Sequence, residues 1–340
     1  MTDREPPAWL WLRDRLSRLR QPTTPARGNA EPLPIVVRTA VVTDSAAALP
    51  SDWVKPFVAD GRLAIVPMPV MVGEEIYGEG EDDITETLSL ALAAGASVKT
   101  SRPSPGQFEQ AYLAAHRRGF ESIVSLHISG GLSGTADAAR LAAQRVSIPV
   151  EVVDSRTVGM ALGMGVQTAL LAAGAGLAAS DVKALAEERL AGTKVYFYVP
   201  SLEQLRRGGR IGAAASLLGA MLSIKPILAV DDGKIVPLEK VRSAARAIAR
   251  LEEIVAADVN SRPAGEARLA VHHFGNVDEA EKLASRLTED CSTCPAVQLS
   301  ALPAVLAAHA GLGVLAVVVG AGEQATPEDP SAPEYWSPDY

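Results

Sequence analysis

Short apolar runs alternate with helical patterns from about residue 37 to residue 320, and this alternation constrains the fold more than any other feature. Apolar runs such as Val36–Val42, 122–128 and 150–153 predict strands, and the alanine-rich or amphipathic segments between them predict helices. Strands that alternate with helices are typical of an α/β protein with a parallel sheet. In the second half, Asp232-Gly233 separates two apolar runs and predicts the turn of a β-hairpin. We therefore expect an α/β fold.

Local signals place several elements more closely. Residues 64–72 predict one strand, which its two prolines mark as an edge or irregular strand. Ser104 and Gln107 have the spacing of a capping box, so a helix is expected over 105–118. The segment 158–175 is almost wholly apolar and small, which predicts a helix buried on all sides. Two further helices are expected at 84–94, after an Asp83 N-cap, and at 212–222.

Composition and charge argue against several classes of protein. The chain of 340 residues has a net charge of −8, whereas general nucleic-acid binding requires a basic surface. No apolar run approaches the roughly 18 residues of a membrane span, and the N-terminus lacks the apolar region of a signal peptide. Two cysteines are too few for a fold built on disulfides, so a cytoplasmic location is expected. Aromatic residues make up 4%, which favours an aliphatic ligand over a stacked base or sugar.

Both ends of the chain differ from the body. Residues 1–36 carry apolar residues from Trp9 to Leu19 at helical spacing among arginines, which predicts a small amphipathic helix. The apolar face of this helix fits a membrane surface, a partner protein or the body of the same chain. Residues 321–340 carry five acids, four prolines and no bases, so we expect a disordered acidic tail.

Hydroxyl groups and glycines gather where expected strands end and helices begin. The stretch Ser129–Thr135, Ser-Gly-Gly-Leu-Ser-Gly-Thr, follows an apolar run and precedes an alanine-rich helical pattern. Glycines let a backbone approach a ligand closely, and a helix N-terminus offers free N–H groups to an anion such as a carboxylate or phosphate. Ligands of open α/β sheets bind beyond the carboxyl ends of the strands. Four other stretches share this placement: Thr43-Asp44-Ser45, Thr100–Ser104, Gly208–Ile211 and His309–Gly313.

The common enzyme motifs fit poorly. Gly131-Leu132-Ser133-Gly134 lacks a glycine required for a nucleophile elbow, and both a dinucleotide fingerprint and a P-loop lysine are missing. The lone Cys291-x-x-Cys294 has no companion ligands for zinc and no thioredoxin-like context, so a structural role is favoured. His272 and His273 are neighbours in an expected strand and face opposite ways, which argues against a shared metal. We expect no metal site.

The motifs also occur in one order and spacing from about residue 37 to residue 320, and this order is more specific than any single motif. They are Thr43-Asp44-Ser45, Thr100–Gly106, Ile128–Thr135, Val153-Asp154-Ser155, Leu205–Ile211, Ile224–Leu228, Asp232–Ile235, Lys240-Val241-Arg242 and His309. The ordered set resembles the DegV family of bacterial fatty-acid-binding proteins. This resemblance implies two α/β domains, 37–157 with a mostly parallel sheet and the headgroup loops, and 158–320 with a mixed sheet.

The resemblance also implies a function. A long-chain fatty acid would lie in an apolar tunnel and present its carboxyl group to a separate kinase that makes an acyl-phosphate for phospholipid synthesis. The protein itself would be a non-catalytic carrier, with the fatty acid as ligand and no cofactor. Arg242 would help to dock the kinase. The carboxyl group would be bound by Ser101 and Ser133, with Thr100, Ser129, Gly134, Arg210 and His309 close by.

Two positions depart from the family pattern. Arg102 stands where the family usually has Gln, and Gly130 stands where it often has a second Ser. One headgroup hydroxyl is therefore expected to be missing. The small-residue helices 158–175 and 212–222 have two interpretations, since they fit either the lining of a tunnel or ordinary close helix packing.

Elementary energetics agree with a fatty-acid carrier, but other functions stay open. Each buried methylene contributes about 0.8 kcal/mol, so a sixteen-carbon chain gains at most on the order of 10 kcal/mol. Hydroxyl groups, N–H groups or an arginine must then offset the cost of burying the carboxylate. One alternative is an enzyme or subunit that uses Asp44, Ser133 or His309 on a small phosphorylated or carbonyl substrate, as in the related dihydroxyacetone kinase architecture. Another is a lipid-sensing regulator that makes peripheral membrane contact through residues 8–20.

Overall fold

A parallel sheet of four strands forms one end of the molecule. The computed structural model describes residues 36–78, 84–217, 224–291 and 294–321. The strand order is β2-β1-β6-β7, and each neighbouring pair is parallel. All six residues of the central β1 are buried, as expected for a parallel strand covered on both faces. The strands are β1 (Thr39–Asp44), β2 (Leu63–Val66), β6 (Ser122–His127) and β7 (Val150–Asp154).

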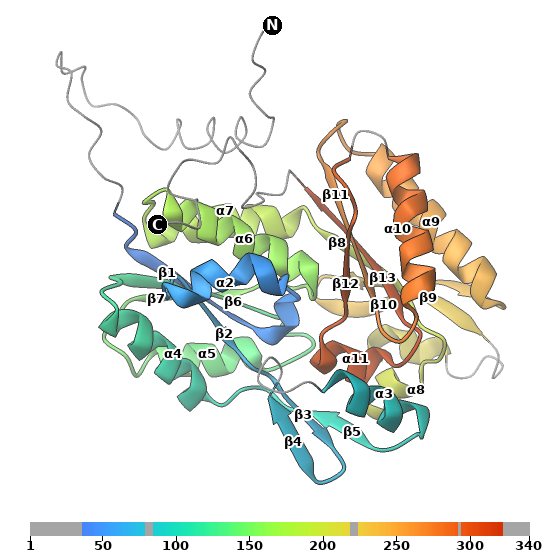
Figure 1. Ribbon diagram of the computed structural model, residues 1–340, viewed down its shortest axis with the longest axis horizontal. Helices are drawn as coiled ribbons and strands as arrows, with labels where there is room; N and C mark the ends of the chain where they lie inside the picture. Colours follow the sequence, from blue (N-terminus) through green and yellow to red (C-terminus); the bar gives the residue numbers. More distant parts are fainter. Residues whose placement is uncertain (1–35, 79–83, 218–223, 292–293, 322–340) are drawn as a thin grey trace, which may run out of the picture.

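Helices cover both faces of this sheet (Figure 1). One face packs against α4 (Pro105–Arg117) and α5 (Thr135–Ala143), and the other against α6 (Met160–Gly174) and α7 (Ala179–Ala191). The helix α2 (Ser51–Ala59) follows a 3₁₀ turn (Ser45–Ala47) and buries Trp53 and Phe57. The capping box expected at the start of α4 is confirmed, because Ser104 accepts a bond from the backbone N–H of Gln107 and the Gln107 side chain bonds back to Ser104.

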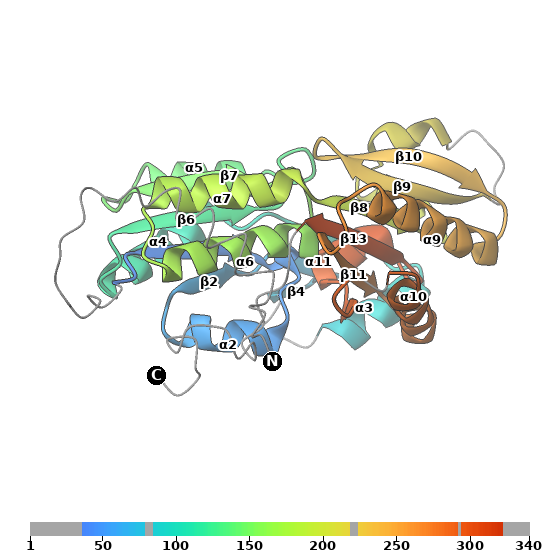
Figure 2. The ribbon, with the colours of Figure 1, turned by 90° about the horizontal axis from the view of Figure 1, so that it is seen from above.

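The helix α6 confirms the expectation of burial on all sides. Fourteen of its fifteen residues are buried. It lies between the parallel-sheet half and the mixed-sheet half of the molecule (Figure 2). It contacts β1 and β6 of the parallel sheet and β13 (Leu315–Ala321) of the second, mixed sheet. A Cβ atom added at Gly163 would lie 2.5 Å from the carbonyl oxygen of Ala47. Its small residues therefore serve close packing rather than the lining of a tunnel.

Residues 64–72 do not form the single strand that the sequence predicts. The chain forms β2 up to Val66, passes Pro67, and begins β3 (Pro69–Val72) in a separate sheet. Proline has no N–H for a ladder, so it ends β2 and permits the chain to change direction. The new sheet has the order β4-β3-β5 and is antiparallel. Its other strands are β4 (Glu75–Gly78) and β5 (Val98–Thr100), and the helix between them is α3 (Thr85–Ala93).

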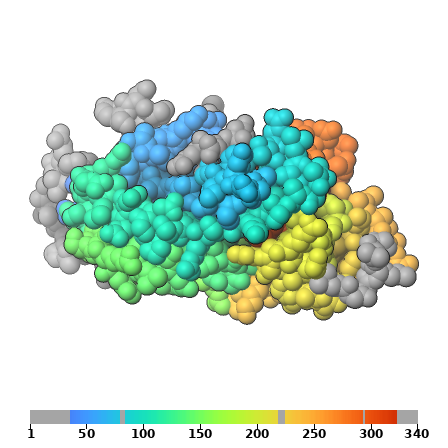
Figure 3. All heavy atoms as spheres, turned by 90° about the horizontal axis from the view of Figure 1, so that it is seen from below, coloured from blue at the N-terminus to red at the C-terminus, as the bar shows by residue number. Residues whose placement is uncertain are grey.

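This small sheet and α3 pack against the C-terminal part of the chain. The helix α11 (Ala304–Ala310) contacts α3, β3 and β5. Arg207 in α8 (Glu203–Arg207) donates a hydrogen bond to the carbonyl oxygen of Gly95. Figure 3 shows the cyan segment that contains α3 lying against the yellow segment that contains α8. Residues from the first half of the sequence therefore pack against part of the second half. The expected domain boundary between residues 157 and 158 stays a prediction.

The second sheet has six strands of mixed direction, in the order β10-β9-β8-β13-β11-β12. The pair β9 and β10 is an antiparallel hairpin with Asp232-Gly233 at its turn, which confirms that prediction. The helices α9 (Ala244–Asn260) and α10 (Val277–Asp290) cover its outer face. The strands are β8 (Lys194–Tyr198), β9 (Lys225–Asp231), β10 (Lys234–Val241), β11 (Ala267–His273), β12 (Gln298–Ala301) and β13.

Some of the expected helices differ in the structure, and other expected features lie outside the described residues. The described part of the helix expected at 212–222 is a 3₁₀ helix, Gly212–Leu217. The helix α3 begins after Ile84 without a side-chain cap, and Asp83 lies outside the described residues. Most of both chain ends, including the expected amphipathic helix and acidic tail, also lies outside them. In the described part of the chain, no helix combines the length and apolar character needed to cross a bilayer.

Candidate functional site

An apolar pocket lies between the inner face of the mixed sheet, α11 and the Ser129–Thr135 loop. It contains about 800 Å³ of space free of protein atoms, part of which is open solvent. Strands β8, β9, β10 and β13 supply one wall, and α11 supplies another. The lining is Met68, Thr100, Ile128, Leu132, Ser133, Val158, Gly159, Val195, Phe197, Leu205, Arg210, Val230, Ile235, His272, Leu302, Val305, Leu306, His309, Ala310, Val314, Ala316 and Val318.

A polar cluster lines part of this pocket, and its four residues, Thr100, Ser133, Arg210 and His309, come from four separate segments of the chain. Thr100, at the end of β5, places its hydroxyl oxygen 2.7 Å from Nε2 of His309 in α11. Arg210 follows α8, and its guanidinium donates to the carbonyl oxygens of Leu132 at 3.2 Å and Gly208 at 2.7 Å. Burial, and after it the positive charge of Arg210, lowers the pKa of His309 to about 4. The imidazole is therefore neutral at neutral pH, and Arg210 provides the cationic group of this cluster.

Gly208 provides the space in which His309 lies. A Cβ atom added there would be 2.1 Å from Nδ1 of His309, far inside contact distance. Nδ1 itself is buried and has no hydrogen-bond partner within the described ranges. A glycine is thus needed here for a close approach and not for an unusual backbone angle.

The loop that carries Ser133 has the form that the sequence predicts, a turn between a strand and a helix. It follows β6 and closes on itself, because the N–H groups of Leu132 and Ser133 both bond to the carbonyl oxygen of Ser129. Ser133 lines the pocket, and its hydroxyl lies 2.8 Å from the hydroxyl of Thr135, the first residue of α5. No side chain caps α5 at Gly134, and the first N–H groups of an uncapped helix can bind an anion.

Three other predicted headgroup residues do not line the pocket. Ser129 is buried, and its hydroxyl donates to the carbonyl oxygen of Gly233 at 2.7 Å. Ser101 is exposed beside Thr100. Gly134 lies under Arg102, whose Nη1 is 2.5 Å from the position that a Gly134 Cβ would take. The structure therefore brings Thr100, Ser133, Arg210 and His309 to the pocket and leaves Ser101, Ser129 and Gly134 beside it.

Gly130 has a local reason to lack a side chain. Its N–H donates to Oδ1 of Asp154 at 3.0 Å, and a Cβ at this position would lie 2.5 Å from Oδ2 of the same carboxylate. A serine could enter only if Asp154 moved. The position expected to have lost a hydroxyl is therefore already filled by the end of β7.

Asp44 lies in a buried network and is not itself a residue of the pocket lining. Its carboxylate accepts from the N–H groups of Ala46 and Ile128 and lies 3.1 Å from Nδ1 of His127. The network continues through Ser125 to Tyr112, and all of these polar side chains are buried. The Asp44 carboxylate is thus bonded within the protein and is not itself a lining residue, whereas Ser133 and His309, the other two residues of the enzyme alternative, line the pocket.

His272 is a pocket residue that the sequence analysis did not assign to the site. Its Nε2 accepts from the N–H of Met160, the first residue of α6, at 3.0 Å, and its Nδ1 lies 3.0 Å from the Ser300 hydroxyl. Acceptance at Nε2 places the ring proton on Nδ1. Complete burial lowers the pKa of His272 to about 4. Both ring nitrogens of His272 are thus bonded within the protein. Met160 and His272 are 112 positions apart, and no sequence signal predicts their contact.

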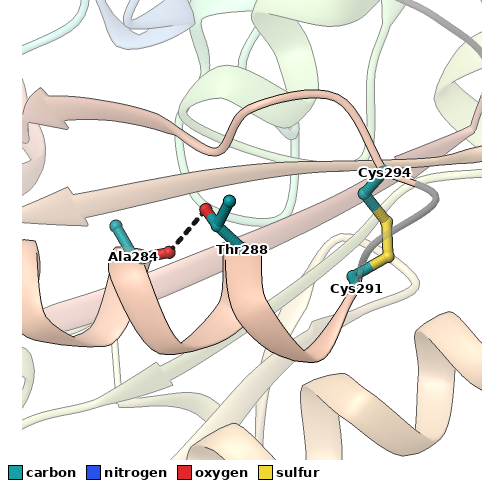
Figure 4. Close-up of a disulfide and its surroundings, with 4 residues drawn as sticks. All are labelled: Ala284, Thr288, Cys291 and Cys294. Atoms are coloured by element: carbon teal, nitrogen blue, oxygen red, sulfur yellow. Dashed lines mark hydrogen bonds between the residues drawn. A yellow bond between two sulfur atoms is a disulfide. The ribbon is translucent and has the colours of Figure 1, made fainter.

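The two cysteines form a disulfide, Cys291–Cys294, at the end of α10 (Figure 4). Their Cα atoms are 5.4 Å apart, and the bond lies between α10 and β12. The expectation of a structural pair that does not build the fold agrees with this local position. Within the described ranges, no group of three or more His, Cys, Asp or Glu side chains is arranged to hold a metal ion.

Arg242, the expected contact for a kinase, is exposed directly after β10. It is not part of the pocket lining. Its place at the surface leaves its guanidinium accessible to a partner.

Comparison with known proteins gives one consistent result. A family model described as an uncharacterised protein of the DegV family matches residues 38–321. A DegV domain-containing protein of Streptomyces coelicolor is 44% identical over 280 residues, which cover 82% of this chain and 97% of the relative.

Solved structures agree in fold over a similar span. A DegV family protein from Thermus thermophilus, described as fatty acid binding, has a TM-score of 0.77 and 30% identity, covering 84% of this chain and 99% of its own. DegV from Bacillus subtilis, described as a fatty acid binding protein, has a TM-score of 0.75 and 29% identity, covering 84% and 100%. Sequence match, close relatives and shared α/β architecture together show that the chain belongs to the DegV family.

Proposed function

We propose that this protein binds one long-chain fatty acid in the pocket, with the acyl chain along the mixed sheet and the carboxylate at the Thr100–Ser133–Arg210–His309 cluster. The observation that carries the proposal is the distribution of polarity. The pocket lining is apolar apart from these four residues and His272, whose two nitrogens are already bonded within the protein. Such a cavity matches a ligand with one charged end and a long apolar body.

The energetics support an acid rather than a wholly apolar ligand. Burial of the acyl chain contributes at most on the order of 10 kcal/mol for sixteen carbons. The carboxylate would lose its hydration, and we expect Arg210, the Ser133 hydroxyl and backbone N–H groups at the start of α5 to replace it. Because His309 is neutral, it adds no second positive charge; with its proton on Nε2 it would donate to the Thr100 oxygen, which leaves the Thr100 hydroxyl proton for the carboxylate.

The relatives support the same class of ligand. The Thermus thermophilus and Bacillus subtilis proteins are described as fatty acid binding, and each aligns with this chain over 84% of its length. We extend the proposal to a non-catalytic cytoplasmic carrier that presents the carboxyl group to a separate ATP-dependent kinase, with Arg242 in the docking surface. The hydrogen bonds that occupy the Asp44 carboxylate within the protein support a carrier over the enzyme alternative.

Native mass spectrometry of protein purified from cells tests the ligand directly. We expect a mass increment of one acyl chain, which organic extraction removes. Delipidated protein should then bind palmitic acid more tightly than methyl palmitate, because only the acid carries a charged headgroup. Absence of a bound acyl chain together with no measurable binding of palmitic acid would refute the proposal.

Two serine variants test the location of the headgroup. Ser133→Ala removes a hydroxyl from the pocket lining, and the expected loss of palmitic acid affinity is roughly tenfold or more, as for a hydrogen bond to a charged group. Ser101→Ala is the matched control, since Ser101 is exposed and outside the lining. The double variant should also lose retention of the acid while the fold persists. Equal effects of the two single changes would contradict this placement.

A further inference from the structure

The turn of the β9–β10 hairpin contacts the loop that carries Ser133. The Ser129 hydroxyl donates to the carbonyl oxygen of Gly233 at 2.7 Å and accepts from the N–H of Gly131 at 3.1 Å. The turn comes from the mixed sheet and the loop from the parallel sheet, so this bond joins the two halves. Ser129 and Gly233 are 104 positions apart in the sequence.

The contact is tight on both sides. A Cβ atom added at Gly131 would lie 2.6 Å from the Gly233 carbonyl oxygen, and one added at Gly233 would lie 2.5 Å from the Ser129 hydroxyl oxygen. Gly233 also has a φ of +76°, a conformation that favours glycine. Any side chain at either glycine would therefore separate the turn from the loop.

An ion pair flanks this contact but contributes little to it. Arg156 and Asp232 pair across the same junction, with 63% and 66% of their side chains exposed. Exposed pairs have small net effects. The fixed geometry comes instead from the buried Ser129 bond and from Asp154, which accepts from the N–H groups of Gly130 and Arg156 at 3.0 Å each.

The Ser133 loop is therefore held from the mixed-sheet half at two points. One is the Gly233 carbonyl on Ser129, and the other is the Arg210 guanidinium on the carbonyl oxygen of Leu132. Ser133 lies between Leu132 and α5, so its hydroxyl has its position in the pocket only while the loop keeps this shape.

We infer that the β9–β10 turn, acting through the Gly233 carbonyl, is a positioning element that sets the Ser133 hydroxyl for a bound carboxylate. This inference rests on the proposed fatty-acid function and deepens it. The mixed-sheet half thereby contributes to recognition of the acid headgroup, although Gly233 itself is not in the pocket lining.

Gly233→Ala tests the inference with two probes on delipidated protein, palmitic acid and methyl palmitate. The new Cβ pushes the turn away from Ser129, so the affinity for the acid should fall roughly tenfold. The affinity for the ester should change by less than about twofold, because the ester relies on the acyl chain and not on a charge-assisted bond from Ser133. A displacement assay with a fluorescent probe of apolar pockets reports both values.

Gly119→Ala is the matched control. Gly119 also has a positive φ, +94°, but an added Cβ meets nothing within 4 Å. It precedes β6 at the amino end of that strand, whereas the Ser133 loop follows the carboxyl end. Similar backbone strain should thus leave both affinities unchanged. If Gly233→Ala does not fold, Ser129→Ala removes the same bond without a steric clash and should lower only the acid affinity.

The outcomes are distinct. Loss of acid affinity with retained ester affinity supports the inference. Equal loss of both ligands assigns the contact a purely structural role and overturns it, as does unchanged selectivity for the acid in a folded Gly233→Ala protein. Failure of the unmodified protein to bind palmitic acid refutes the proposed function itself, before any variant is compared.

Discussion

Replacement of His272 by glutamine should flatten the dependence of protein stability on pH. In the folded protein this imidazole is fully buried, accepts from the N–H of Met160 and has a pKa of about 4. Its ordinary value in an unfolded chain is about 6.5. As the pH falls, the unfolded chain therefore takes up a proton on His272 first, and that uptake favours unfolding.

The size of the effect follows from these two values. Stability from His272 is fully present above pH 6.5, is lost between pH 6.5 and pH 4, and falls no further below pH 4. The difference corresponds to about 3 kcal/mol of unfolding free energy at 1.36 kcal/mol for each pH unit. His309, with a pKa also near 4, contributes in the same direction.

Urea unfolding of delipidated protein at a series of pH values between 7 and 4 measures this loss. His272→Gln removes the titrating group and keeps an oxygen that can accept the Met160 N–H, and His309 and all carboxylates are the same in both proteins. The unmodified protein should lose about 3 kcal/mol more than the variant over this interval. Parallel stability curves for the two proteins would refute the assignment of a neutral, buried imidazole at the start of α6.

Three further predictions concern other positions. Gly208→Ala places a Cβ 2.1 Å from Nδ1 of His309, so it should displace the ring from Thr100 and lower palmitic acid affinity roughly tenfold in a folded protein; unchanged affinity would argue against His309 in the headgroup site. Ser104→Ala removes the cap of α4 and should lower the unfolding free energy by about 1 kcal/mol, measured by urea titration, whereas an unchanged midpoint would contradict the capping role. Arg242→Glu should leave acid binding intact but reduce acyl-phosphate formation by a fatty acid kinase, and undiminished product would exclude Arg242 from docking.

Much of the fold follows from local sequence patterns. Parallel strands such as β6 carry buried apolar residues on both faces, the Asp232-Gly233 pair directs one hairpin, and Ser104 with Gln107 starts α4. These signals depend on neighbours within a few positions. Pro67 shows where such signals end, because a proline interrupts a strand but does not specify which sheet the chain joins next.

The site is less accessible to sequence reasoning. The motif order drew attention to Ser129 and Ser133 alike, yet the turn directs one hydroxyl toward Gly233 and the other toward the pocket. Which way each serine points depends on the hairpin, 104 positions away from Ser129. His272 was missed for the same reason, since its role comes from a contact with Met160 and not from its neighbours in the strand.

The passage of β3, α3 and β5 onto α11 makes the two halves interdependent. Thr100, from β5, supplies one polar group of a cavity that is lined mostly by residues from β8 onward. A fragment beginning at residue 158 would leave part of α11 bare to water and its His309 without that hydroxyl. Truncation between residues 157 and 158 would thus yield an incomplete binding pocket. A chimera that exchanges the two halves between relatives would have to take the segment from β3 to β5 from the same parent as the C-terminal part.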